Sequence, residues 1–375
     1  MTLTAPPNGR VAVIGAGVFG VTAAVHLARD GWQVGLFESQ RSIMVGATGN
    51  NVFRLHRGYH YPRSLDTARE TKQSVESFVR EYGEAVIRSK QHLYAISKFG
   101  SRVTAQQFLE HCRQAALEVD VVSSPLLKTE SVELVIEALE WRMDPVDLRA
   151  IGQRHIAAAG VQLFLETEAG PSVVDDYDYV VLCGNAKSNA LMRQWGVAPP
   201  RRQFEVCEVA IMKGAELGDT DIVVMDGPFN SLSPYGRREG LHILYDVEHS
   251  VHHRFVSETF EPPEQYRALL SNPAGEQTEL TAFEAMIKTA RQYVNGLDNA
   301  EYFGSLWSVR TVLADVDATD ARPTIVNWVA PTVMTLFSGK LVTAVTAAES
   351  VVTELRARSG RDHAQAVVPE HLCAN

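Results

Sequence analysis

The chain has 375 residues, of which 45% are hydrophobic and 21% charged, and this ordinary globular composition excludes a chain that is disordered throughout. Its 45 acidic and 35 basic residues give a net charge of −10, which disfavours nucleic acid as a partner because phosphate backbones attract basic surfaces. At roughly 150 residues per domain, the length predicts more than one domain.

The first predicted unit runs from Val11 to Glu38 and combines an apolar strand, a glycine-rich turn, a helix and a second apolar strand. In its GxGxxG pattern, Gly15 permits the tight turn, Gly17 admits a pyrophosphate close to the backbone, and Gly20 lets helix and strand pack closely. Glu38 follows the second strand, where a carboxylate accepts hydrogen bonds from a ribose. The unit predicts dinucleotide binding by a Rossmann-type parallel sheet.

A loop from residue 46 to residue 64 follows, rich in Gly, Asn, Arg, His and Tyr, and such a polar and aromatic loop is typical of a binding site. The next segments alternate between helical and strand patterns, and Asp144 and Pro145 are suited to start one of the helices. We expect helices over 65–86, 104–117 and 145–159, and strands over 91–97, 132–141, 161–165 and 180–183, the last breaking into a turn at Gly184.

Alternating patterns over 204–213 and 241–247 predict antiparallel strands, with a strand and turn over 225–236 between them. A helix over 280–293, an irregular loop over 307–324 and a strand-turn-helix over 333–350 complete the chain. The predicted fold class is therefore α/β, a Rossmann-type domain with an inserted mixed or antiparallel β-sheet domain. We expect the nucleotide domain at 1–80, 145–200 and 305–360, the inserted substrate domain at 81–144 and 201–304, and a tail at 361–375.

Four segments, in order, resemble the D-amino-acid-oxidase-like FAD-dependent oxidoreductases: IGAGVFG with Glu38, GATGNN through LHRGYHYPRS, VVLCGNAKSN, and TLFSGKLVTAVTAAESV. The LHRGYHY loop is similar to the H-x-G-x-x-Y element of the glycerol-3-phosphate and L-2-hydroxyglutarate dehydrogenases in that family. The resemblance implies FAD in the Rossmann-type domain, roofed by the inserted sheet.

The sequence departs from these dehydrogenases where they contact substrate. His60 stands where they carry Arg or Tyr, and VRTVLADVDATDARP replaces the usual Gly-Arg-Pro ending. The segments EVCE (205–208) and VMDGPF (224–229) are closer to a bacterial subgroup whose substrate we cannot name. The resemblance therefore implies a cofactor but no particular substrate.

Residue by residue, the resemblance implies that the glycine turn and Glu38 bind the ADP half of FAD. It implies that the GATGNN turn lies along the pyrophosphate and ribityl chain. It also implies that the SGK segment places the start of a helix against the flavin. A positive helix end there would stabilise charge on the reduced ring. The cofactor residues so implied are Gly15, Gly17, Val18, Phe19, Gly20, Glu38, Ser39, Arg41, Ala47, Thr48, Asn50, Asn51, Gly184, Asn185, Ser338, Gly339, Lys340 and Leu341.

Five residues are candidates for catalysis. His60 is the first choice to accept the substrate proton and His56 the second, because imidazole titrates near neutral pH; either could instead pack or bond to backbone. Arg310 and Arg54 suit an anionic substrate, although surface ion pairs are the alternative for any single arginine, Arg57 and Arg63 included. Tyr61 is a substrate-orienting residue or a core aromatic.

Other chemically capable residues receive structural interpretations. We expect His249, His252 and His253 to lie in a solvated hairpin loop. Together with His242 they could suggest a metal site, but no cysteine or suitable acid pair lies near them, so we predict none. Asp226 is expected to cap a turn. Cys183 is expected to be a small core residue.

The function expected from this resemblance is oxidation of a C–H next to an amine or hydroxyl, with hydride transfer to flavin N5. The electron acceptor would be O₂ or a soluble carrier. Alternatives are a flavin monooxygenase, an NAD-dependent dehydrogenase and a catalytically idle flavin-binding module. Widely spaced cysteines, no signal-peptide pattern and no apolar run of about 20 residues indicate a cytoplasmic location without a membrane span.

Overall fold

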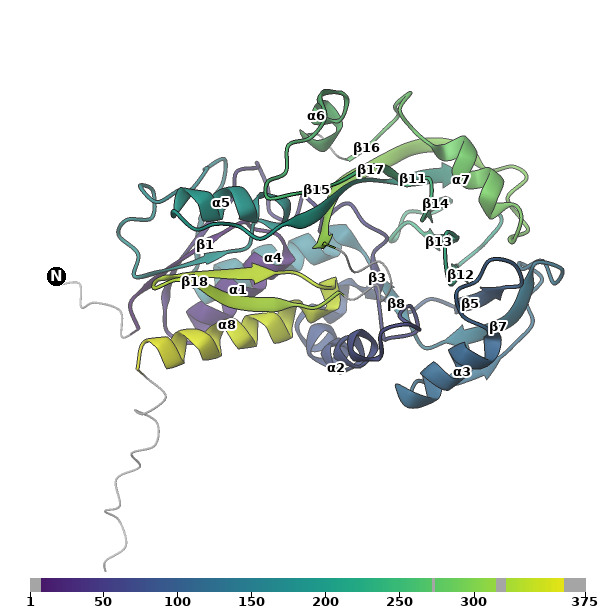
Figure 1. The fold of residues 1–375 in the computed structure, drawn as a ribbon, viewed down its shortest axis with the longest axis horizontal. Helices are drawn as coiled ribbons and strands as arrows, with labels where there is room; N and C mark the ends of the chain where they lie inside the picture. The colour runs from purple at the N-terminus through teal and green to yellow at the C-terminus, as the bar shows by residue number, and fades with distance from the viewer. Residues whose placement is uncertain (1–7, 272–273, 315–321, 361–375) are drawn as a thin grey trace, which may run out of the picture.

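The computed structural model describes residues 8–271, 274–314 and 322–360. Figure 1 shows a parallel sheet with its helices beside a larger, mostly antiparallel sheet. This arrangement confirms the predicted α/β fold class, with one mostly parallel and one mostly antiparallel sheet. The tail predicted at 361–375 lies outside the described residues.

A six-stranded sheet contains the N-terminus and the last strands of the described chain. Its strand order is β18-β19-β10-β1-β2-β9, and every neighbouring pair is parallel except the β18–β19 hairpin. The bounds are β1 (Arg10–Ile14), β2 (Gln33–Phe37), β9 (Gln162–Phe164), β10 (Tyr179–Leu182), β18 (Ile325–Ala330) and β19 (Val333–Phe337). Because β1 lies between β10 and β2, the chain leaves the sheet at its centre through the glycine turn.

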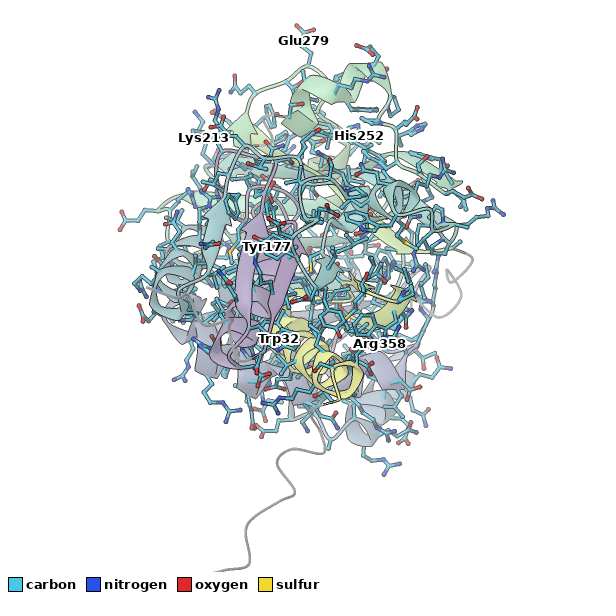
Figure 2. The ribbon with its side chains drawn as sticks, turned by 90° about the vertical axis from the view of Figure 1, so that its left-hand side faces the viewer. Trp32, Tyr177, Lys213, His252, Glu279 and Arg358 are labelled. Carbon is cyan, nitrogen blue, oxygen red and sulfur yellow. The ribbon has the colours of Figure 1, made fainter. Side chains whose placement is uncertain are left out.

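Helices pack on this sheet and on one another around one large apolar core. Helix α1 (Val18–Arg29) contacts α4 (Pro145–Ala159) and α8 (Ala344–Arg358), and α2 (Leu65–Tyr82) packs against α8. On the other face, Tyr177 lies over β2, with its ring 5.8 Å from that of Phe37 (Figure 2). Both faces of the parallel sheet are thus covered, as a parallel sheet requires.

A ten-stranded sheet contains most of the remaining strands. Its order is β16-β17-β11-β14-β13-β12-β5-β7-β6, with β15 also paired to β11, and all pairs are antiparallel except β12 with β5. The bounds are β5 (Gln91–Ser97), β6 (Val119–Val121), β7 (Val132–Ala138), β11 (Arg202–Lys213), β12 (Thr220–Met225), β13 (Asn230–Pro234), β14 (Leu241–Asp246), β15 (Val251–Ser257), β16 (Ala274–Glu276) and β17 (Glu301–Leu313).

A small third sheet joins the polar loop to the rest of the molecule. Its order is β3 (Arg54–Leu55), β8 (Trp141–Met143) and β4 (Val86–Ile87), all antiparallel. Helix α7 (Phe283–Ala290) packs on the large sheet against β13 and β14. The remaining helices, labelled in Figure 1, are α3 (Ala105–Gln114), α5 (Ser188–Gln194) and α6 (Glu264–Ser271). The 3₁₀ turns are η1 (Gly83–Ala85), η2 (Asn185–Lys187) and η3 (Leu341–Thr343).

Local signals explain where several helices begin and end. Helix α4 begins as predicted, because the Asp144 side chain accepts from the N–H groups of Val146 and Asp147 at 2.8 and 3.1 Å. It ends at Gly160, whose φ of +69° suits glycine. Helix α2 ends at Tyr82, four residues before the predicted end, because the chain turns there into η1 and β4.

Two predictions about loops are wrong. The segment predicted to be irregular over 307–324 is strand through Leu313, because β17 pairs along its length with β11. His252 and His253 lie on β15 and not in a hairpin loop, because β15 pairs with the first half of β11. Residue 305, the domain boundary expected from the sequence, lies within β17. By contrast, α4, β5 and β14 match their predicted ranges closely.

None of the helices in the described ranges is both long and apolar enough to cross a membrane.

Candidate functional site

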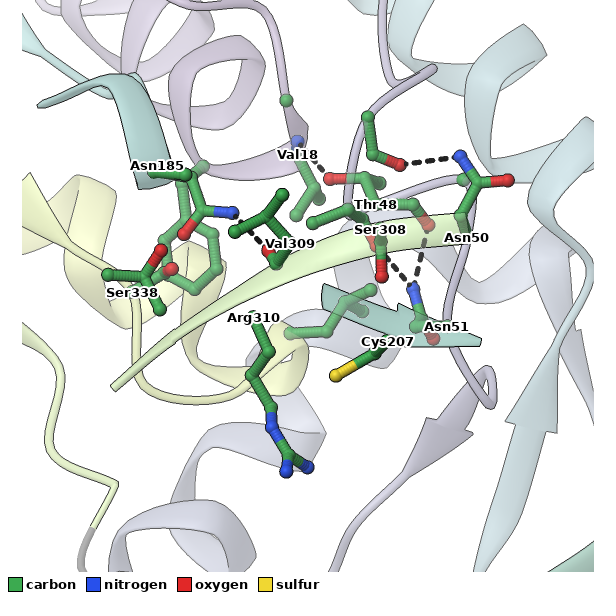
Figure 3. Close-up of a pocket in the computed structure, with 18 of the residues that line it drawn as sticks. Val18, Thr48, Asn50, Asn51, Asn185, Cys207, Ser308, Val309, Arg310 and Ser338 are labelled. Atoms are coloured by element: carbon green, nitrogen blue, oxygen red, sulfur yellow. Dashed lines mark hydrogen bonds between the residues drawn. The ribbon is translucent and has the colours of Figure 1, made fainter. Parts of the chain in front are cut away.

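A cavity of about 1980 Å³ runs between the parallel sheet and the large antiparallel sheet. Its walls come from the β1–α1 turn, the end of β2, the polar loop, β11, β17 and the segment before α8, several of which are drawn in Figure 3. Pockets for ordinary small ligands are about 300–1,000 Å³. This cavity therefore has room for a large ligand together with a smaller one.

The glycine turn forms one end of the cavity. Gly15 has a φ of +103°, which only glycine adopts readily, and Gly20 packs so closely that an added Cβ would lie 1.8 Å from the Gly15 carbonyl oxygen. A Cβ on Gly17 would meet only Thr48 Oγ1, at 3.3 Å, so the start of α1 stays open to the cavity. Glu38 lines the same region and accepts from the Ala16 and Gln40 N–H groups at 2.8 and 2.9 Å.

The GATGNN turn is held in shape by its own side chains (Figure 3). Thr48 Oγ1 accepts from the Val18 N–H at 3.1 Å, next to the open glycine. The Asn50 amide donates to the carbonyls of Val45 and Gly46 at 2.7 and 2.9 Å, and the Asn51 amide donates to backbone carbonyls of the same turn. Both asparagines thus stabilise the loop that lines the cavity.

The opposite wall joins the turn after β10 to β17 and the segment before α8. Asn185, with a φ of +49°, donates from its amide to the Val309 carbonyl at 3.2 Å (Figure 3). The Gly339 N–H donates to Thr324 Oγ1 at 3.3 Å, and the Lys340 ammonium lies 4.6 Å from the centre of the Tyr61 ring. A 3₁₀ turn, Leu341–Thr343, precedes α8 here.

The structure brings the predicted cofactor residues together. Every one of the eighteen lines the cavity except Gly20, which packs beneath the turn. Of the five candidate catalytic residues, His56, His60, Arg54 and Arg310 line the cavity and Tyr61 does not. Tyr61 is only 2% exposed, and the centre of its ring lies 5.4 Å from those of both histidine rings, so it packs against the pair.

His56 and His60 form a stacked pair, with ring centroids 5.0 Å apart. Burial lowers the pKa of His56 to about 4, although the neighbouring carboxylate of Glu140 raises it. Burial and the positive charge of Arg54 hold the pKa of His60 well below its ordinary value. Both rings are therefore neutral at pH 7 and able to accept a proton.

Glu140 is a buried carboxylate that lies beside His56 and that the sequence does not identify as a candidate. Its Oε1 lies 3.3 Å from His56 Nδ1 and accepts from the Tyr94 hydroxyl at 2.7 Å, while its Oε2 accepts from the Arg57 N–H at 3.0 Å. Burial alone would raise the pKa of Glu140, but His56, His92 and Arg54 lower it to about 2. Glu140 follows a strand as an ordinary polar residue, so the sequence carries no signal for it.

Arg54 is a buried cation for which no carboxylate partner is present within the described ranges. It is 6% exposed, and its one hydrogen bond to a residue of the described ranges runs from Nη2 to Ser231 Oγ at 3.4 Å. Its Nε and Nη1 atoms have no partner, and neither do the side-chain atoms of the neighbouring pocket residue Asn230, among the residues described. Unpaired buried polar groups are rare in proteins, and beside a cavity they indicate where a ligand binds.

Arg310 projects into the cavity from β17 (Figure 3), and it shares one carboxylate partner with Arg254. Its Nε donates to Glu205 Oε2 at 2.5 Å, and Arg254 lies 2.9 Å from the other oxygen of that carboxylate. Glu205 is 1% exposed; burial would raise its pKa, but Arg310 and Arg254 lower it, so it stays ionised. The sequence analysis did not predict this role for Glu205.

The other arginines considered are paired or lie outside the cavity. Arg63 Nε lies 2.6 Å from Asp226 Oδ2, and both residues line the cavity, so the Asp226 carboxylate has an ion-pair role that the expectation of a turn cap did not include. Arg57 does not line the cavity and lies 5.1 Å from the centre of the Trp141 ring.

The remaining polar residues of interest have local partners. His252 Nε2 lies 2.8 Å from Glu208 Oε2, and His242 Nε2 lies 3.1 Å from the Gly218 carbonyl. Cys183 is buried, as expected, and it borders the cavity.

Known proteins match this chain along most of its length. The sequence profile of the family described as FAD dependent oxidoreductase matches residues 10–327. The FAD-dependent monooxygenase kojA of Aspergillus flavus is 26% identical, over 94% of this chain and 87% of its own length.

Solved structures share the fold at low sequence identity. Glycine oxidase from Geobacillus kaustophilus has a TM-score of 0.68 and 14% identity, covering 97% of this chain and all of its own. L-α-glycerophosphate oxidase from Mycoplasma pneumoniae, solved with FAD bound, also has a TM-score of 0.68 and 14% identity, over 94% of each chain.

Proposed function

This chain belongs to the family of FAD-dependent oxidoreductases, and from that premise we propose that it oxidises a C–H bond next to an amine or hydroxyl of a small, polar, anionic molecule. One observation carries the proposal. The neutral His56–His60 pair and the unpaired Arg54 line the same cavity as the dinucleotide-type glycine turn. A proton acceptor, an anion-binding group and a cofactor site thus share one space.

The residues present fit FAD, the cofactor of the family. The opening beside Gly17 and the start of α1 leaves room for a pyrophosphate, where backbone N–H groups and the helix dipole favour negative charge. Glu38 lies at the end of β2, the position from which a carboxylate reaches a ribose. When bound, FAD supplies the hydride acceptor for the reaction.

The two histidines supply a base. Because burial keeps both rings neutral, His60 or His56 takes the proton of the substrate hydroxyl or ammonium as the C–H bond breaks. Glu140 beside His56 Nδ1 favours the tautomer whose Nε2 is free to accept. The base is thereby fixed in orientation before substrate arrives.

Positive charge around His60 favours an anionic substrate. Arg54, Lys340 and Arg322 are the cations that lower the pKa of this ring after burial itself. Arg54 Nε and Nη1, which have no hydrogen-bond partner within the described chain, are available to donate to the oxygens of an anionic ligand. Glu205 offsets part of the positive charge of Arg310 and Arg254, and the three groups together keep a net positive charge.

The test is to incubate the FAD-loaded chain in air with amino acids, amines, 2-hydroxy acids and sugar derivatives, and to identify the products. The proposal predicts a carbonyl product without added NAD(P)H, because the substrate itself supplies the electrons. Under ¹⁸O₂ that product should contain no ¹⁸O, since O₂ or a soluble carrier accepts electrons only. A product that requires NAD(P)H and contains ¹⁸O would contradict it.

A monooxygenase is the second candidate, favoured by the name of the relative from Aspergillus flavus. Flavin monooxygenases commonly have a second Gly-Asp motif in the C-terminal half, whereas this chain has Ser338, Gly339 and Lys340 at the corresponding place. Unlike the proposed reaction, monooxygenation consumes an external reductant and leaves one oxygen atom from O₂ in the product. The isotope experiment above separates the two.

Two further alternatives give different outcomes. An NAD-dependent dehydrogenase would give a colourless protein and would leave the GATGNN turn without a role. A catalytically idle flavoprotein would retain its FAD and show the same phenotype after the double substitution His60→Ala and Arg310→Ala. An active oxidoreductase would lose turnover in that double variant.

A further inference from the structure

A line of buried ionisable side chains runs from the cavity to the far side of the protein. It begins at His56, continues through Glu140 and His92, and reaches Asp221 on β12. The side chains of Glu140, His92 and Asp221 are at most 1% exposed, and none of the three lines the cavity. Burying so many ionisable groups is costly, and the packing of the sheets alone does not require it.

His92 is the central residue of this line. Its Nε2 lies 3.9 Å from Glu140 Oε1 and its Nδ1 lies 4.0 Å from Asp221 Oδ2. Neither ring nitrogen has a hydrogen-bond partner in the described part of the chain. The ring therefore lies between two carboxylates without being fixed to either, and a small tilt brings it within reach of one or the other.

The far end of the line opens to solvent. Asp221 Oδ2 accepts from Ser89 Oγ and lies 3.0 Å from Arg142 Nη1. The other terminal nitrogen of Arg142 donates to Asp219, whose side chain is 46% exposed. Asp221 thus contacts half-buried Ser89 directly and is connected to the exposed Asp219 through Arg142.

We propose that His56, Glu140, His92 and Asp221 form a proton relay that carries the proton released by substrate from the cavity to solvent near Ser89 and Asp219. The inference rests on the proposed function for its proton source. It assigns a role to Glu140 and His92, which touch neither the substrate space nor the cofactor residues and act through His56.

Each hop breaks one bond to hydrogen and forms another. His56 gives its Nδ1 proton to Glu140 Oε1 after Nε2 has taken the substrate proton. Glu140 passes a proton to His92 Nε2, and His92 releases its Nδ1 proton to Asp221 Oδ2, from which it leaves to water. His56 and His92 then each hold their remaining proton on Nε2, and both rings return to the Nδ1–H tautomer, by ring rotation or proton exchange, before the next turnover.

The surroundings of His92 suit a neutral, switching ring. The ring stacks on Tyr94 with centroids 5.4 Å apart, Arg142 and Arg54 face it as cations, and Glu140 and Asp221 face it as anions. Burial is the main cause that lowers the pKa of His92, and the two cations add to it, while the two carboxylates oppose it. A neutral imidazole has one N–H, and here either carboxylate can receive it.

The test reads the His92 ring directly and needs no substrate. The full chain, FAD-loaded and ¹⁵N-labelled at histidine, is examined by NMR near pH 7, and the His92 signals are assigned by their loss in His92→Gln. The relay predicts averaged ring ¹⁵N shifts from two exchanging tautomers. In Glu140→Gln the proton should settle on Nδ1, facing Asp221, and in Asp221→Asn it should settle on Nε2, facing Glu140.

His242 is an internal reference for a fixed ring, because its Nε2 is bonded to the Gly218 carbonyl. A single tautomer of His92 in the wild type, unchanged in Glu140→Gln, would show a purely structural ring and overturn the relay. A doubly protonated His92 clamped between both carboxylates would overturn it as well. The wild-type spectrum decides this even if one variant fails to fold.

A second readout follows the proton at the cavity. The His56 ring N–H in the FAD-loaded chain should exchange with water at least about tenfold more slowly in His92→Gln than in the wild type, since a positioned transfer group contributes about 10²–10⁴-fold. Equal exchange rates would overturn the relay. Neither readout uses turnover, so a failure of the proposed oxidation leaves these results interpretable.

Discussion

His56 and His60 stack face to face, with ring centroids 5.0 Å apart and an angle of 25° between their planes. At this distance a proton on one ring disfavours a proton on the other, because two positive charges in a buried site repel strongly. The pair therefore takes up at most one proton beyond its neutral state. Only His56 is in contact with Glu140, through which that proton can leave.

Removing the base should slow flavin reduction without releasing FAD. We expect His60→Ala or His56→Gln to lower the anaerobic rate of flavin reduction by about 10²–10⁴-fold, the usual contribution of a general base. The visible spectrum should still show bound flavin. His253→Ala is the control, since this exposed histidine lies on β15 outside the cavity lining. Wild-type rates in both site variants would show that neither ring is the base.

The pH profile should reveal the low pKa of the pair. Because the neutral ring accepts the proton, and burial lowers the pKa of His56 to about 4, the rate should stay constant down to weakly acidic pH and fall only near pH 4. Glu140 raises this pKa, so Glu140→Gln should move the fall to still lower pH. A fall centred at the ordinary histidine value of 6.5 would contradict this assignment.

The buried histidines should also make stability depend on pH. The pKa values of His56, His60 and His92 are all lower in the folded chain than their ordinary value of 6.5. On acidification the unfolded chain binds protons first, so the free energy of unfolding falls below pH 6.5 by up to about 1.4 kcal/mol per pH unit for each ring. Thermal midpoints at pH 7.5, 6 and 5 measure this loss.

The variant His92→Gln should reduce this dependence on pH, whereas His253→Ala should leave it unchanged. Equal slopes in the wild type and His92→Gln would mean that folding does not lower the pKa of His92.

Two glycines of one motif should behave differently. Gly17→Ala should fold with nearly wild-type stability, because its Cβ meets only Thr48 Oγ1, yet bind FAD more weakly because the methyl group occupies the phosphate space. Gly20→Ala should instead lose about 1–3 kcal/mol of stability, since its Cβ would collide with the Gly15 carbonyl. Thermal unfolding measures the stability of each variant, and FAD titration measures its affinity for the cofactor. A Gly20→Ala variant with wild-type stability and FAD binding would contradict the packing described.

Arg54 should matter for the substrate charge more than for the fold. Arg54→Met removes a buried cation without a carboxylate partner in the described structure, so the thermal midpoint should stay the same or rise. Binding of a carboxylate substrate should weaken by about 1.5–3 kcal/mol, while its neutral amide should be affected little. Arg57→Met, outside the cavity, is the matched control. Equal weakening for the acid and the amide would exclude Arg54 as the anion-binding group.

The sequence predicts the cofactor end of the site well because local rules govern it. Gly15, Gly17, Gly20 and Glu38 belong to one strand-turn-helix-strand unit. Because the parts of this unit follow one another directly in the chain, the local sequence is enough to predict it. The Asp144–Pro145 start of α4 is equally local, and the structure has it as predicted.

The catalytic end depends on contacts between distant segments. Glu140 meets His56 only because β8 pairs with β3, and Glu205 meets Arg310 because β11 and β17 pair in that register. Neither pairing produces a recognisable local sequence pattern, and the sequence predicts an irregular loop from residue 307, which includes the second half of β17. His252 was likewise placed in a loop because the strand pairing of β15 with β11 has no local signal.

The most direct test of the central claim is to mix the FAD-loaded chain anaerobically with amines, amino acids, 2-hydroxy acids and sugar derivatives while following the flavin absorption near about 450 nm. The account predicts that one anionic class bleaches this band without NAD(P)H, and that His60→Ala slows the bleaching. Bleaching by NAD(P)H alone, with every candidate substrate inert, would contradict direct oxidation of substrate in this cavity.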